Sequence, residues 1–166
     1  MRLTAVIIEM LVFAAIFTVL VFSMLRKKET DAGIHNYPPD IQEEYFKTHP
    51  RRDVSYRSGN VVLAKSCGLL LFIAVLTACA LFAGAQSFLQ GFLLSFGLMC
   101  CIGAYDTFFL DWVLFANLKC FRLPGTEHMD KAYHQKWFHV RGMLFPGLIF
   151  ALIPAAAVGL IVKLIR

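Results

Sequence analysis

Four polar side chains in the second half of this chain have the chemistry of general acids and bases. They stand at or just beyond the end of a long apolar stretch, and they are Asp106, Asp111, Glu127 and His139. Carboxyl and imidazole side chains can act as general acids and bases. Ionisable residues within membrane spans either pair with another group or take part in catalysis or transport. We therefore take these four residues as candidates for catalysis at a membrane interface.

Asp106 and Asp111 are five residues apart in the sequence. On an α-helix this spacing separates two side chains by about 140° around the axis, so we do not expect one tight pair. Asp106 lies deeper in the apolar stretch, where an ionised carboxylate needs a cation, and Arg122 or Arg141 can supply one. The pattern fits a structural ion pair that fixes the third span to the following loop, and it also fits a catalytic or transport role.

Histidines and carboxylates between residues 127 and 139 raise the question of a metal site. Imidazole and carboxylate groups are good ligands for transition metals. The stretch contains no H-E-x-x-H motif or other closely spaced pair, and Glu127 and His134 are two helical turns apart. We predict no metal and no cofactor, with His134 and His139 as weak candidates for ligands.

The same stretch has the pattern of an amphipathic segment before the last span. Thr126 is expected to cap a helix that runs to about His139, with Glu127 in its first turn opposing the positive end of the helix dipole. Trp137 and Phe138 would then face lipid while the charged residues stay in water.

Glu9 is the one charged residue of the apolar segment Leu3–Leu25. A carboxylate at the centre of a span costs about 2.5–3.5 kcal/mol on insertion scales, and less near the membrane edge. Glu9 is therefore a candidate proton or cation site for transport. The alternative is a hydrogen-bonded carboxyl, or one that reaches out to the interface.

One stretch determines the elements that position these residues. Ser66–Tyr105 contains forty residues and no Asp, Glu, Lys or Arg, whereas one membrane-spanning helix needs only about 20. Gly84-Ala85-Gln86-Ser87 at its middle predicts the turn of a helical hairpin. Two further apolar segments, Leu3–Leu25 and Gly142–Val162, bring the number of expected spans to four.

The predicted fold is an all-α membrane protein, a single polytopic domain of residues 1–166 with four transmembrane helices in a compact bundle. The chain is 58% hydrophobic, above the usual content of soluble domains. We expect the first segment to be retained rather than removed as a signal, because it is long and a basic run follows it. The expected spans are about 3–25, 61–84, 88–112 and 142–162, with loops at about 26–60 and 116–141.

Lysine and arginine are concentrated in the two long loops. Residues 26–65 hold eight of the sixteen, residues 119–141 hold five, and the remaining three lie near the chain ends. The positive-inside rule then places both loops in the cytoplasm and both termini outside. Basic loops beside an anionic leaflet account for the net charge of +5, so no nucleic acid partner is predicted.

Small residues recur four apart in the spans, as in Ala151-x-x-x-Ala155-x-x-x-Gly159. Such spacing lets helices approach closely in lipid. It fits packing within the bundle, and it equally fits contact with another chain. The predicted partner is the lipid bilayer, with a homo-oligomer or a membrane-protein partner left open.

Three short motifs carry a resemblance to a known family. They are Asp111-Trp112, Pro124-Gly125-Thr126-Glu127 and Phe138-His139-Val140-Arg141-Gly142. Together they resemble an uncharacterised family of small bacterial four-span integral membrane proteins, over about Asp106–Gly142, under a quarter of the chain. The resemblance implies a bacterial inner-membrane protein and supplies no activity. His128 stands where the family pattern has glycine, which leaves Asp111, Glu127 and His139 as the better functional candidates.

Three functions remain open on these observations. The first is a non-enzymatic accessory or partner-binding membrane protein, which the absence of a recognised catalytic motif favours. The second is an enzyme that acts at the cytoplasmic interface on a lipid or amphipathic substrate through the four candidates above. The third is a small transporter or channel that uses Glu9.

Overall fold

The computed structural model describes residues 1–26, 33–49 and 59–166, in which regular structure is entirely helical. Parts of the first predicted loop, residues 27–32 and 50–58, lie outside the described residues. The α-helices are α1 (Leu3–Arg26), α2 (Pro39–Thr48), α3 (Gly59–Phe82), α4 (Phe88–Tyr105), α5 (Asp130–Tyr133), α6 (Lys136–Gly142) and α7 (Leu148–Ile165). Two short 3-10 helices are η2 (Ile34–Asn36) and η4 (Lys119–Phe121), and two π-helical segments are η3 (Asp106–Phe115) and η5 (Met143–Gly147).

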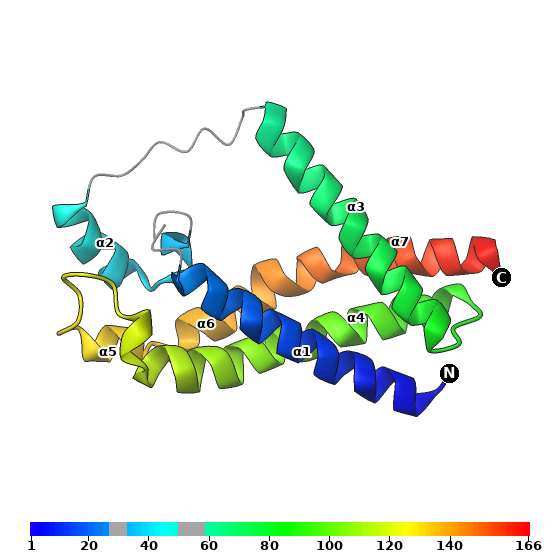
Figure 1. Ribbon diagram of the computed structural model, residues 1–166, viewed down its shortest axis with the longest axis horizontal. Helices are drawn as coiled ribbons and strands as arrows, with labels where there is room; N and C mark the ends of the chain where they lie inside the picture. The colour runs from blue at the N-terminus through cyan, green and yellow to red at the C-terminus, as the bar shows by residue number, and fades with distance from the viewer. Residues whose placement is uncertain (27–32, 50–58) are drawn as a thin grey trace. The chain divides into compact units, whose positions relative to one another are not determined.

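Four helical stretches in the described part of the chain are long and apolar enough to cross a membrane. They are Leu3–Ser23, Val61–Phe82, Phe88–Phe115 and Asp130–Ile165 (Figure 1). The predicted all-α, four-span class is thereby confirmed. The third span reaches beyond its predicted end because η3 continues α4, and the fourth begins early because α5, α6 and η5 lead into α7.

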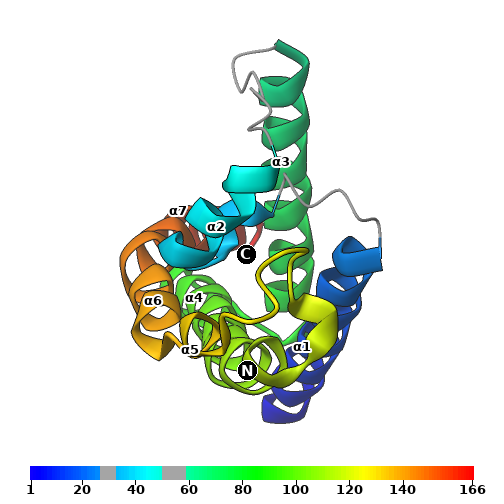
Figure 2. The ribbon, with the colours of Figure 1, turned by 90° about the vertical axis from the view of Figure 1, so that its left-hand side faces the viewer.

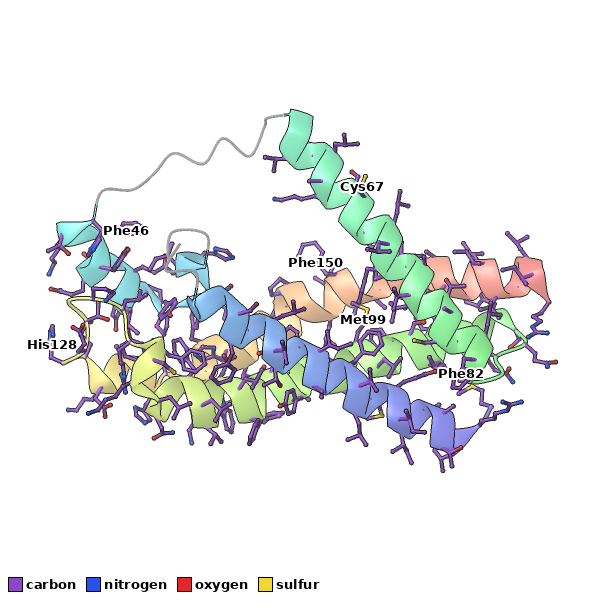
Figure 3. The ribbon with its side chains drawn as sticks, viewed as in Figure 1. Phe46, Cys67, Phe82, Met99, His128 and Phe150 are labelled. Carbon is purple, nitrogen blue, oxygen red and sulfur yellow. The ribbon has the colours of Figure 1, made fainter. Side chains whose placement is uncertain are left out.

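Large apolar side chains stand on the outer surfaces of the spans. Phe82 on α3 is 63% exposed and Phe150 on α7 is 67% exposed (Figure 3). Burial of such surface away from water is worth about 25 cal/mol per Å². These faces therefore favour hydrocarbon as the solvent of the spans.

The turn between α3 and α4 falls where the sequence predicts it. Gly84 has φ +83°, a left-handed conformation that glycine adopts without strain. The N–H of Ala85 donates to the Ala80 carbonyl at 2.9 Å, and the N–H of Gly84 donates to the Leu81 carbonyl at 3.0 Å. This is the Schellman pattern of helix ends. Ser87 then caps α4, because its hydroxyl accepts a backbone N–H from the first turn.

The chain divides into two compact units. The first contains Met1–Phe13, Val54–Gly103 and Leu144–Arg166, and in it α3 packs across α7 (Figure 1). Most of its buried core residues are alanine, leucine or valine. They are Ala5, Leu76, Ala80, Ala83, Ala85, Leu94, Leu98, Val158 and Val162.

Glycines let α4 and α7 approach closely within this unit. A Cβ added to Gly159 would lie 2.8 Å from the backbone oxygen of Phe88, and one added to Gly91 would lie 3.0 Å from a methyl carbon of Val162. Ala155, on the same face of α7 as Gly159, is also buried. The small-residue spacing is therefore used for packing inside the unit, where close approach gains dispersion contacts.

The second unit contains Ala14–Asp53 and Ala104–Met143, and its core is rich in aromatic rings. In it α2 packs on α5, and α6 packs on η3 (Figure 2). The Tyr37 hydroxyl donates to the Phe121 carbonyl at 3.0 Å. Burial first, and the neighbouring Tyr133 second, raise the pKa of Tyr37 above its usual range, so this phenol remains a neutral donor. The buried core residues are Ile34, Tyr37, Ile41, Tyr45, Phe115, Phe121, Leu123, Ala132 and Tyr133.

The single helix predicted from Thr126 to about His139 is wrong. The stretch forms two short helices, α5 and α6. The Thr126 hydroxyl is buried, donates to the Leu123 carbonyl at 2.9 Å and lies 2.6 Å from the Tyr133 hydroxyl. An oxygen held this way is not the cap of a following helix. Trp137 is 81% exposed and His139 is buried, and the lipid contact predicted for Trp137 and Phe138 stays a prediction.

The π-helical winding of η3 changes the relation between Asp106 and Asp111. In a π-helix each N–H bonds to the carbonyl five residues back, so residues five apart return to one face. Asp106 begins η3 and Asp111 follows five residues later. The angle between the two side chains around the axis is therefore smaller than α-helical geometry gives. The expectation that they form no tight pair stays a prediction.

We predict that Gly159→Ala destabilises the protein by about 1–3 kcal/mol, because the added methyl group overpacks the contact with Phe88. The matched control is Gly68→Ala on α3, where an added Cβ meets nothing within 4 Å. That change should be neutral or mildly stabilising, since alanine favours a helix by about 1 kcal/mol over glycine. Reversible unfolding in detergent measures both changes, and equal effects would contradict the close α4–α7 approach.

Candidate functional site

The best-defined polar contact in the second unit joins two of the predicted catalytic candidates. Asp111 on η3 and His139 on α6 meet with Oδ2 and Nδ1 2.9 Å apart. An ionised carboxylate only accepts hydrogen bonds, so we assign the imidazole proton to Nδ1. The opposite nitrogen, Nε2, then carries a lone pair and can accept a proton.

Both side chains of this pair are largely removed from solvent. The His139 side chain is 7% exposed and that of Asp111 is 22% exposed. Nε2 of His139 is buried without a hydrogen-bond partner. The Phe115 and Phe138 rings each lie with their centroids 5.2 Å from that of the imidazole. An unpaired acceptor in apolar surroundings costs free energy, about 1–3 kcal/mol, which a structural histidine would avoid by pairing.

Asp106 is the third predicted candidate in this neighbourhood. It lies on the same helix as Asp111, and both Asp111 and His139 interact with it electrostatically. The lone pair on Nε2 of His139 can accept a proton, and the Asp111 carboxylate at Nδ1 can stabilise the imidazolium that forms.

Glu127, the fourth candidate, is placed elsewhere. It lies in the exposed turn before α5 and has no ion pair with any residue that the structure describes. His128, next to it and labelled in Figure 3, is also exposed. The structure thus brings Asp106, Asp111 and His139 together and leaves Glu127 apart.

The two arginines proposed as partners for Asp106 are placed differently: Arg122 contacts other residues, and Arg141 is exposed. The Arg122 Nη2 lies 2.7 Å from Oδ1 of Asp130 and donates to the Ala116 carbonyl at 2.8 Å. Its guanidinium also lies 3.9 Å from the centre of the Tyr133 ring, a cation–π geometry. Arg141 is exposed on α6. Arg122 therefore stabilises the loop between η3 and α5 through its contacts with Ala116, Asp130 and Tyr133.

The weak metal candidates are not gathered with other ligands. His134 Nδ1 lies 2.8 Å from the backbone oxygen of Asp130, and His139 is paired with Asp111. No group of three or more His, Cys, Asp or Glu side chains is placed to hold a metal ion among residues 1–26, 33–49 and 59–166.

Sequence reasoning did not identify the residues that hold the pair in register. The Trp112 indole N–H points at the Lys136 carbonyl at 3.4 Å, and the Lys136 ammonium lies 4.9 Å from the Trp112 ring centre. These contacts tie η3 to α6 one residue after Asp111 and three before His139. Phe115 packs against His139 and Tyr133. Of these residues, only Trp112 was part of a motif noted in the sequence, Asp111-Trp112. That motif did not indicate that Trp112 contacts Lys136.

The first unit holds one further predicted site residue, Glu9. Its side chain lies in the protein interior with 7% exposure, and neither carboxyl oxygen has a hydrogen-bond partner. The Cys79 thiol on α3 interacts with it electrostatically. Glu9 is therefore in the core of this unit rather than at the lipid interface.

Comparisons with protein-family models, curated proteins and solved structures find no match to this chain. The resemblance to a family of small bacterial four-span proteins accordingly stays a prediction.

We predict that a double-mutant cycle on Asp111→Ala and His139→Ala gives a coupling of about 1–3 kcal/mol, because a hydrogen bond to a charged, poorly solvated partner is strong. The matched control is Asp130 with His134, whose charged atoms are 3.7 Å apart and whose side chains are 72% and 39% exposed. That pair should couple by only about 0–1 kcal/mol. Unfolding in detergent provides the free energies, and indistinguishable couplings would mean that Asp111 and His139 are not bonded.

Proposed function

We propose that this protein is an enzyme of the membrane interface that uses Asp111 and His139 as a general acid–base pair on a lipid or other amphipathic substrate. The observation that carries the proposal is the 2.9 Å contact at Nδ1 together with a buried, unpartnered Nε2. A carboxylate that orients an imidazole, and leaves its other nitrogen free, is the arrangement used to remove a proton from a substrate.

The proposed chemistry starts with a proton on Nδ1 and a lone pair on Nε2. Nε2 takes a proton from a hydroxyl or another weak acid on the substrate, and Asp111 stabilises the imidazolium that forms. The deprotonated oxygen then forms a bond to the reacting centre of the substrate, the bond from that centre to its leaving group breaks, and the imidazolium gives its proton to the departing atom. Because Nε2 is covered here, a substrate must replace apolar contacts such as that with Phe115.

The position of the pair supports an amphipathic substrate. Asp111 lies in the third apolar stretch and His139 in the fourth. Trp112 follows Asp111 directly, and Trp137, two residues before His139, is 81% exposed. Tryptophan favours the headgroup region of a bilayer. A substrate that reaches this depth needs an apolar part, which is the property of a lipid.

The accessory-protein hypothesis finds less support. It rested partly on small residues that could face another chain, and Gly91 and Gly159 are used for packing within the first unit. A homo-oligomer or membrane-protein partner stays a prediction, as does the transporter that would use Glu9.

The orientation proposed for the chain has the Asp111–His139 pair at the cytoplasmic face of a bacterial inner membrane, with both termini outside. The supporting observation is that thirteen of sixteen Lys and Arg fall in the two long loops and the start of the second span. We predict that alkaline phosphatase fused after Arg166 is active in intact cells and that a green fluorescent protein at the same place is dark. A fluorescent, phosphatase-negative C-terminus would reverse the proposed topology.

We predict that His139→Ala and Asp111→Asn abolish the function in cells. General acid–base catalysis contributes about 10²–10⁴-fold, so the substrate should accumulate as it does in cells that lack the gene. The measurement is lipid mass spectrometry on deletion cells complemented with each variant at equal membrane level. His128→Ala, a change at an exposed histidine, is the matched control and should restore the wild-type lipid profile.

Two outcomes count against the enzyme. One is a restored lipid profile with His139→Ala at normal protein level. The other is a deletion that leaves the extractable lipids unchanged, which would remove the proposed substrate class.

A further inference from the structure

We infer that Glu9 is a proton-binding site in the membrane-spanning part of the first unit, separate from the Asp111–His139 pair and independent of the enzyme proposal. The ligand is a proton held by the carboxyl group itself. The inference rests on the position of Glu9 on α1, on its burial and on the lack of hydrogen-bond partners for its carboxyl oxygens.

Glu9 lies on the face of α1 that packs into the core. Ala5, one turn before it, is 5% exposed and belongs to the buried core, and Met10 and Phe13 pack against that core. Ile8, immediately before Glu9, is 57% exposed. The carboxyl therefore does not reach out along the lipid face, where long polar side chains find headgroups and water.

The two carboxyl oxygens have no hydrogen-bond partner, although both are buried. An ionised carboxylate in that condition carries a large desolvation cost, whereas a protonated carboxyl is neutral. Ser95 on α4 has a fully buried hydroxyl that also has no partner. Thr77 on α3 is buried too, but its hydroxyl donates to the Ile73 carbonyl at 2.8 Å.

Neither carboxyl oxygen of Glu9 is paired with a cation in the described part of the chain. The cations nearest to it in the sequence are Arg2 and the N-terminal amine of Met1, both at exposed residues before α1. From α3 the Cys79 thiol interacts with it, while Lys65 stands in the opposite half of that helix. The α4 helix contains no Asp, Glu, Lys or Arg. On α7 the one charged residue is Lys163, which is exposed in the last turn. A proton is thus the counter-charge that fits these described surroundings.

A metal cation fits the same place less well. Hard cations take about six oxygen ligands. Glu9 offers two oxygens, Ser95 one, and the Thr77 oxygen is engaged with its own helix. No cluster of three or more His, Cys, Asp or Glu occurs in the described part of the chain.

An apolar cavity lies between α1 and α4 next to residues that neighbour Glu9 in the sequence. Its volume is about 280 Å³. Val6 and Met10, which flank Glu9 in the sequence, line one side, and Leu94, Gly97 and Cys101 of α4 line the other. A hydrophobic carbodiimide can enter from lipid, and it reacts with a carboxyl group that carries its proton.

The experiment treats the full chain in lipid vesicles with dicyclohexylcarbodiimide and locates adducts by peptide mass spectrometry. We expect one adduct, on Glu9, and we expect its rate of formation to be the same at pH 6 and at pH 8. An exposed glutamate, with a pKa of about 4.3, would instead react more slowly as the pH rises over this range. Glu9→Gln should lose the adduct, and His139→Ala should keep it, so the result does not depend on the enzyme proposal.

Glu9→Gln also tests the site without the reagent, because glutamine has the size of a neutral glutamic acid. We expect its thermal unfolding temperature to match that of the wild type at neutral pH and to exceed it in alkali, where the wild type must ionise a buried group. An unlabelled Glu9 in a folded wild type, or labelling that falls steeply from pH 6 to pH 8, would overturn the inference. A Glu9→Gln variant far less stable than the wild type at neutral pH would do the same.

Discussion

Hydrocarbon offers no hydrogen bonds, and that constraint governs where polar atoms sit in this protein. Backbone groups in the spans are satisfied by helix formation. The turn between α3 and α4 provides hydrogen bonds for the last carbonyls of α3, because Gly84 adopts the left-handed conformation that this turn requires. Polar side chains that remain inside must pair with one another, carry a proton or bind something.

The two units meet this constraint in different ways. In the second unit the hydrogen bond between Asp111 and His139, on different helices, offsets part of the free-energy cost of burying both side chains. The contact between Trp112 and Lys136 holds the two helices in register. Among the described residues of this unit, the buried side-chain atoms that have no hydrogen-bond partner are Nε2 of His139 and Nη1 of Arg122. In the first unit they are both carboxyl oxygens of Glu9 and the Ser95 hydroxyl.

Composition was enough to predict the class of the fold, because a forty-residue uncharged stretch can only fold as two spans in a bilayer. Residue type was enough to select Asp111 and His139 as candidates. Their contact was not predictable, since it joins η3 to α6 through tertiary packing that neither residue type nor apolar periodicity encodes. The π-helical winding of η3 was not predictable from apolar periodicity either. Thr126 failed as a cap for a similar reason. Its partners, Leu123 and Tyr133, are set by tertiary packing that a local motif does not encode.

The state of the His139 ring is the most direct test of the acid–base account. Nitrogen-15 solid-state NMR on the protein in lipid bilayers distinguishes a protonated ring nitrogen from one with a free lone pair. The account predicts a proton on Nδ1, hydrogen-bonded to the Asp111 carboxylate, and a lone pair on Nε2 at neutral pH. It also predicts that Asp111→Asn weakens this preference. A ring that carries its proton on Nε2, with the same spectrum in Asp111→Asn, would contradict it.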